Sequence, residues 1–153
     1  MDESTVTVDR HARTGPLVGA GRRPTGLVAS LVIVAGAALM IASSLIHLHL
    51  WASGYKNIHT IGPLFLVQGI AGIVLAVAVA LIRRVFMAVL GALFAAGTLA
   101  GLLVSVHFGI FGYRETMTAP WATTSLIVEA AAAGVLLIGG ALVLRGERAG
   151  AHH

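Results

Sequence analysis

The chain has 153 residues, of which 58% are hydrophobic and 10% are charged, whereas an average soluble domain carries about 25% charged residues. The absence of cysteine excludes disulfides, thiolate metal sites and thiol catalysis. The net charge of +4 comes from basic residues that flank apolar segments, so it indicates membrane topology and not nucleic-acid binding.

The first 24 residues are polar, of mixed charge and rich in Gly, Thr and Arg, which predicts a disordered cytoplasmic tail. The apolar run that follows, over about 26–50, is longer than the roughly 7–15 residues of a signal-peptide core. We therefore predict that this segment is not cleaved and remains as the first membrane-spanning helix.

Three more apolar segments follow, and each matches the roughly 20 residues needed to cross a bilayer. Glu129 is the one charged residue inside any of the spans. The predicted fold is all-α, a polytopic membrane four-helix bundle over 25–146, followed by a cytoplasmic tail at 147–153. The predicted helices cover about 26–50, 61–82, 85–110 and 122–144.

The distribution of Lys and Arg predicts the orientation in the membrane. The outer loops contain only Lys56 and Arg114, and aromatic residues suited to the membrane interface lie in or beside these loops. The other eight basic residues lie on the opposite side: Arg10, Arg13, Arg22, Arg23, Arg83, Arg84, Arg145 and Arg148. The positive-inside rule then places both termini in the cytoplasm, in a multi-pass protein of the plasma membrane.

The two halves of the chain resemble each other. His49 and the following Gly54-Tyr55-Lys56 match His107 and Gly112-Tyr113-Arg114, 58 residues later, and Gln68 matches Glu129, 61 residues later. Two tandem helical hairpins of the same orientation, related by an axis along the membrane normal, would produce this pattern. The alternative is chance similarity between two apolar hairpins, and the polar matches argue against it.

Four polar residues form a predicted layer in the outer third of the membrane: Glu129, Gln68, His49 and His107. Glu129 lies seven residues inside its span, or roughly 10 Å from the outer end. An acidic residue at this depth is either a proton, ion or ligand site, or a hydrogen bond that fixes helix register. We expect Glu129 to face the bundle interior, with a partner among the other three residues.

The histidines permit two cofactor hypotheses. His47, His49 and His59 could bind a divalent metal, although two residues on a helix are separated by about 200°, so His47 and His49 converge only outside a regular helix. His49 and His107 could clamp a non-covalent haem b, because no Cys-x-x-Cys-His is present. Ser43 precedes His47 by four residues, a spacing that favours a hydrogen bond over a nucleophilic pair.

The run His47-Leu48-His49-Leu50-Trp51, with Gly54-Tyr55-Lys56 and the segment 61–66, resembles the first outer loop of small four-helix membrane proteins found in high-GC, actinobacterial-type genomes. The resemblance covers the first two helices. It implies the same topology, and no activity is assigned to that group.

No nucleophile elbow, Walker loop or Rossmann fingerprint is present. We therefore expect a non-enzymatic plasma-membrane module in the lipid bilayer, either an accessory subunit of a larger membrane complex or a homo-oligomer. One alternative is a redox protein that binds haem or quinone in the outer His/Glu layer. Another is a small proton-coupled carrier centred on Glu129.

Overall fold

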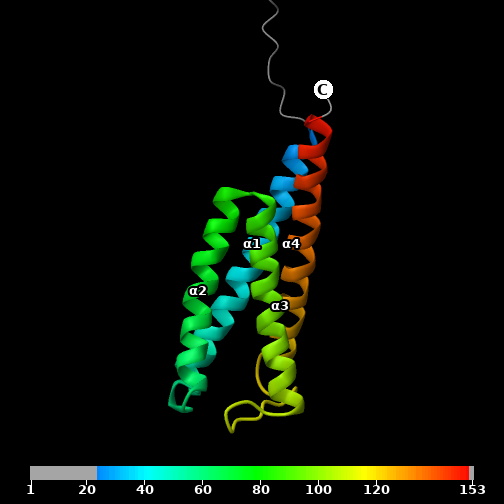
Figure 1. The fold of residues 1–153 in the computed structure, drawn as a ribbon. Helices are drawn as coiled ribbons and strands as arrows, with labels where there is room; N and C mark the ends of the chain where they lie inside the picture. Colours follow the sequence, from blue (N-terminus) through cyan, green and yellow to red (C-terminus); the bar gives the residue numbers. More distant parts are fainter. Residues whose placement is uncertain (1–23, 152–153) are drawn as a thin grey trace, which may run out of the picture.

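The computed structural model describes residues 24–151, which form four long helices joined by two short connections and a longer loop at 108–121 (Figure 1). The helices are α1 (Pro24–Ser53), α2 (Ile61–Ile82), α3 (Val85–His107) and α4 (Ala122–Gly150), with a short 3₁₀ helix η1 at Tyr55–Asn57. Each long helix has the length and apolar composition needed to cross a membrane. The predicted all-α four-helix fold is confirmed, and the chain is a multi-pass membrane protein.

Two helix ends differ from the sequence-based boundaries. α3 ends at His107 because Gly109 adopts a φ of 80°, and its N–H donates to the carbonyl oxygens of Val104 and Ser105. α4 continues to Gly150, because the Arg, Glu and Ala residues after 144 favour helix. Residues 1–23 of the predicted N-terminal tail and residues 152–153 lie outside the described part of the chain.

α1 crosses the bundle diagonally and packs against two helices (Figure 1). It lies along α4 in both of its halves, with Gly36 in contact with Leu136 and Ser43 in contact with Glu129. Its second half also lies against α2, where Leu48 packs over Gly69. α3 packs along α4, but α2 and α3 make few contacts although only Arg83 and Arg84 separate them. The bundle is therefore closed on three sides and open between α2 and α3.

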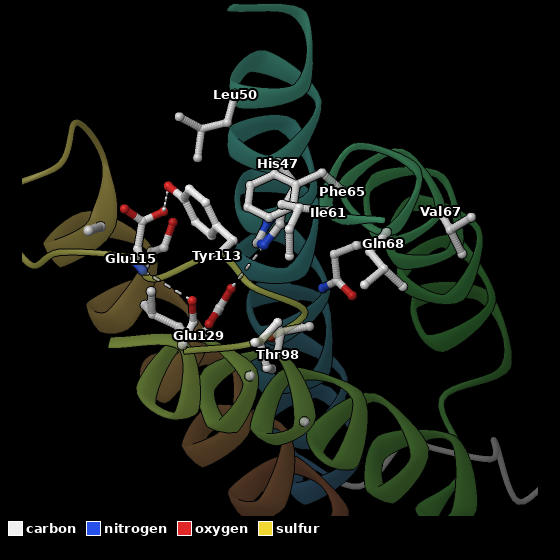
Figure 2. Close-up of a pocket in the computed structure, with 18 of the residues that line it drawn as sticks. His47, Leu50, Ile61, Phe65, Val67, Gln68, Thr98, Tyr113, Glu115 and Glu129 are labelled. Carbon is white, nitrogen blue, oxygen red and sulfur yellow. Dashed lines mark hydrogen bonds and ion pairs between the residues drawn. The ribbon is translucent and has the colours of Figure 1, made fainter. Parts of the chain in front are cut away.

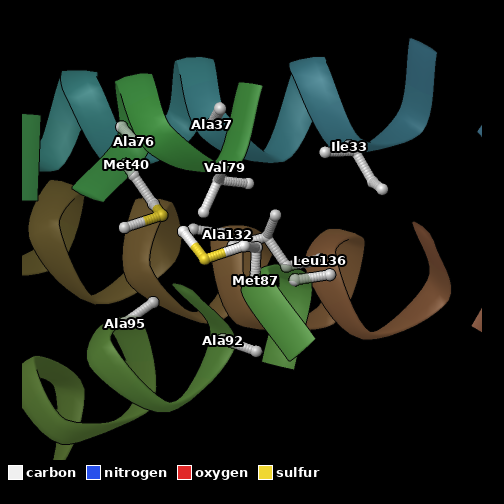
Figure 3. Packing of buried hydrophobic residues seen from close by; sticks show 11 residues of the cluster. Ile33, Ala37, Met40, Ala76, Val79, Met87, Ala92, Ala95, Ala132 and Leu136 are labelled. Carbon is white, nitrogen blue, oxygen red and sulfur yellow. The ribbon is translucent and has the colours of Figure 1, made fainter. Parts of the chain in front are cut away.

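The apolar core fills only the half of the bundle near the α2–α3 turn, which we call the turn end (Figure 3). Small residues on facing helices let the backbones approach closely there, as expected for membrane helices. The core is formed by Ile33, Ala37, Met40, Ala76, Val79, Met87, Ala88, Ala92, Ala95, Ala132 and Leu136.

The opposite half, which we call the loop end, contains the segments 54–60 and 108–121. Here Gly97 and Gly101 of α3 face α2, and a Cβ atom at either position would meet no atom within 4 Å. No side chain from α3 fills the space at these two positions. The loop end is consequently hollow where the turn end is packed.

The structure bears on the predicted repeat in two ways. The matched residues Tyr55 and Tyr113 meet, with hydroxyl oxygens 3.3 Å apart and ring centroids 5.9 Å apart. The packing of the two halves is unequal, because α1 lies closely along α4 whereas the matched pair α3 and α2 stays apart. The duplication itself remains a prediction.

Candidate functional site

A cavity of about 460 Å³ occupies the loop end of the bundle (Figure 2). α2 forms one wall with Phe65 and Gln68, and α3 forms the other with Gly97, Thr98 and Gly101. α1 and α4 close the floor, and the segment 110–120 covers the loop end. The volume falls in the range of about 300–1,000 Å³ that small-molecule sites occupy.

The cavity opens sideways between α2 and α3. Leu64 and Val67 of α2 and Leu93 of α3 line it and are also largely exposed on the helix surface. In a membrane these three side chains face acyl chains. A molecule dissolved in the bilayer could therefore enter without crossing the aqueous phase.

Glu129 lies at the cavity floor and is 1% exposed, so its predicted orientation toward the bundle interior is confirmed. Ser43 Oγ of α1 donates a 3.1 Å hydrogen bond to Glu129 Oε1. No group within residues 24–151 forms a hydrogen bond with the second carboxyl oxygen, Oε2. The Thr98 hydroxyl lies near the carboxyl group, but it donates to the carbonyl oxygen of Ala95. Because buried polar groups are nearly always paired, this oxygen is the most unusual feature of the site.

His47 is the second polar group at the floor. Its Nδ1 lies 2.9 Å from the carbonyl oxygen of Ser43, and a carbonyl only accepts, so Nδ1 carries the proton. In the neutral ring Nε2 is then an acceptor. Nε2 lies 3.8 Å from Glu129 Oε1, which is beyond hydrogen-bonding distance (Figure 2). The ring packs against Phe65 with centroids 5.0 Å apart.

The structure does not place the expected partners of Glu129 in direct hydrogen bonds with it. Gln68 lines the same cavity as Glu129, but it makes no hydrogen bond to Glu129. His49 is exposed and packs edge-on against Trp121, and His107 is exposed beside Phe108. The physical reason is the helical repeat. His49 follows His47 by two residues, which are about 200° apart around the helix, so His49 points away from the interior when His47 points toward it.

The three-histidine metal hypothesis is not supported. His47 points inward, His49 packs on Trp121, and the exposed His59 lies 3.0 Å from Thr60 Oγ1. No group of three or more His, Asp or Glu side chains within the described residues lies close enough to hold a metal ion.

The haem hypothesis is also not supported, because His49 and His107 do not line a common cavity. A small surface pocket contains His49 with Leu45, Ile46 and Trp121, and neither histidine lines the large cavity between α2 and α3. The structure therefore does not bring these two possible axial ligands together.

A second polar cluster, which we call the outer cluster, closes the loop end of the cavity. Glu115 is 8% exposed, and its Oε2 accepts hydrogen bonds from the hydroxyls of Tyr55 (2.7 Å) and Tyr113 (3.1 Å). Its backbone N–H donates to Ser105 Oγ, and the N–H of Thr116 donates to Glu115 Oε1. Burial raises the pKa of Tyr55, and the hydrogen bonds to Tyr113 and Glu115 raise it further.

The sequence-based hypotheses missed Ser43, His47 and Glu115 as members of one site. The spacing of Ser43 and His47 placed both on one helix face, and this signal pointed correctly to their hydrogen bond. The signal for Glu115 was an isolated acid in an outer loop, directly after the Tyr113-Arg114 pair.

The site thus combines apolar walls, lateral access and a buried carboxyl oxygen without a partner. Such a combination can hold a molecule that has an apolar body and one polar head. No protein-family model, curated protein or solved structure matches this chain.

Proposed function

We propose that the protein is a non-enzymatic binding module of the plasma membrane that takes a lipid-soluble small molecule into the cavity between α2 and α3. Both termini are cytoplasmic in this proposal, which the placement of eight of the ten basic residues supports. The loop end and the cavity then lie in the outer half of the bilayer.

The observation that carries the proposal is the unpaired Oε2 of Glu129. In the hydrocarbon region no water is available to satisfy a polar group, and an unpaired one costs several kcal/mol. A ligand that offers a polar hydrogen at the cavity floor would remove this cost. The carboxyl group would then fix the polar head while the apolar walls hold the body.

A purely structural role for Glu129 explains less of the geometry. The Ser43 hydrogen bond ties α1 to α4 through one carboxyl oxygen and leaves the other unused. Gly97 and Gly101 face open space, whereas Gly36 and Gly139 are filled by Leu136 and Ile33. Glycines that leave room rather than permit close packing are typical of a place where another molecule approaches.

The proposal can be tested with 3-trifluoromethyl-3-phenyldiazirine, a neutral photoreactive probe that dissolves in lipid. The purified protein in lipid nanodiscs is irradiated, and modified residues are mapped by peptide mass spectrometry. We expect modification at the cavity floor, on Ser125 and Glu129, which line the cavity and do not belong to the outer helix surface.

Two matched variants make the test specific. Gly97→Leu places a large side chain in the cavity and should abolish modification of the floor. Gly134→Leu makes the same change on α4. A Cβ atom at Gly134 also meets nothing within 4 Å, and Gly134 does not line the cavity. Modification confined to outward residues such as Ile127 and Leu137 in the wild-type protein would contradict the proposal.

A further inference from the structure

We propose that the ligand is a lipophilic ammonium, an apolar body with one cationic nitrogen that carries at least one N–H, and that this nitrogen binds Glu129. The inference rests on the proposed function of the cavity and names the chemical class that the cavity accepts.

The hydrogen-bonding inventory of the floor leaves room for a donor from the ligand. The Ser43 hydroxyl already donates to Glu129 Oε1, and the His47 N–H already faces the Ser43 carbonyl. The two positions left over are Glu129 Oε2 and His47 Nε2. When Glu129 is ionised, its carboxylate and a neutral Nε2 both accept, so a ligand head with N–H donors satisfies them together.

The charge of the cavity favours a cation over an anion. Its lining contains two carboxyl groups, Glu129 at the floor and Glu115 at the loop end, and no Lys or Arg of the described residues 24–151. Arg114, the nearest basic residue in the sequence, directs its guanidinium to the carbonyl oxygens of Val106 and His107. A phosphate or carboxylate would meet two carboxyl groups and no cationic side chain, whereas an ammonium can pair with an ionised carboxylate.

The walls match the remainder of such a molecule. The rings of Phe65, Phe94 and Tyr113 line the cavity, and aromatic faces attract a cation with little water around it. The mouth between Leu64 and Leu93 is apolar, so an alkyl or cage-like body can rest there in contact with acyl chains. A hydrophilic amine has no such partner surface and is not expected to bind.

The test compares three probes built on one apolar cage: 1-adamantanamine, 1-adamantanol and N,N,N-trimethyl-1-adamantanammonium. Each competes with the diazirine for the cavity in nanodiscs at pH 7, and empty nanodiscs supply the correction for partitioning into lipid. The readout is the concentration that halves modification of α3 residues at the cavity wall, around Thr98.

We expect the amine to protect at a concentration about tenfold or more below that of the alcohol, because hydrogen bonds to charged groups are the stronger ones. The quaternary ammonium has the charge but no N–H, so it should fall between the two. In Glu129→Gln the advantage of the amine over the alcohol should disappear, while Gly134→Leu should retain it.

The outcomes separate the two proposals without reliance on any variant. Absence of floor modification in the wild-type protein overturns the proposed function itself. If the floor is modified, but the amine does not reduce modification around Thr98 or reduces it no better than the alcohol, the cavity remains a binding site and the ammonium class is overturned. Equal protection by the amine and the quaternary ammonium overturns the requirement for an N–H.

Discussion

Ser43 on α1 donates a 3.1 Å hydrogen bond to Glu129 on α4, across 86 residues of sequence. The bond lies at the boundary between the packed turn end and the hollow loop end. It joins the two helices that pack most closely and orients the carboxyl group toward the cavity.

Ser43→Ala should lower the free energy of unfolding by about 1 kcal/mol, because hydrogen bonds between membrane helices contribute roughly 0.6 and at most about 1.7 kcal/mol. The measurement is unfolding in mixed micelles by increasing the fraction of sodium dodecyl sulfate. Ser53→Ala is the control, since the exposed Ser53 hydroxyl bonds only to the carbonyl of His49 within its own helix. Equal effects of the two substitutions would show that the interhelical bond contributes nothing.

Gly36→Ala should destabilise the bundle, because a Cβ atom at this position would lie 2.6 Å from Cγ and Cδ2 of the fully buried Leu136. Forcing extra volume into a packed core typically costs about 1–3 kcal/mol. Gly134→Ala is the matched control on α4, where the new methyl group meets no atom within 4 Å. If the two variants have the same free energy of unfolding, α1 and α4 do not pack closely at Gly36.

The two tyrosines should resist ionisation at alkaline pH. Burial raises the pKa of both Tyr55 and Tyr113, so each phenol keeps its proton in the folded protein at a pH where it would lose it in the unfolded chain. Stability from these groups is therefore fully present below about pH 10 and is lost as the pH rises above it. The chain contains only these two tyrosines, so phenolate absorbance near 295 nm reports on them alone.

Glu115→Gln should shift this titration to lower pH. The carboxylate raises the pKa of Tyr55 both by accepting its hydrogen bond and by its negative charge, and the amide provides no charge. The folded variant should form phenolate at a lower pH than the wild-type protein. An unchanged titration would mean that Glu115 does not contact the tyrosines.

Cysteine labelling should report the proposed orientation without background, because the natural chain has no cysteine. Asn57→Cys lies in the connection between α1 and α2, and Gly150→Cys lies at the end of α4, and both positions are exposed. In intact cells a membrane-impermeant maleimide should label the first variant and not the second. Labelling of Gly150→Cys before lysis would show that the orientation or the number of membrane-spanning helices differs from the proposal.

The sequence alone was sufficient for the coarse architecture and for one member of the site. Segments of membrane length with at most one charged residue predicted four helices, because a charged side chain is costly in hydrocarbon and the scarcity of charge can be seen directly in the sequence. The same cost predicted that Glu129, the one acid within a span, turns away from lipid.

The partners of Glu129 depended on the tertiary structure. These helices are apolar on nearly all sides, so their sequences hold little information about which face turns inward. Close packing of Gly36 on Leu136 and Gly69 on Leu48 decides the rotation of α1, and with it that His47 faces the cavity and His49 does not. The cavity exists because Gly97 and Gly101 face the gap that α2 and α3 leave open, and only the packing of all four helices determines that gap.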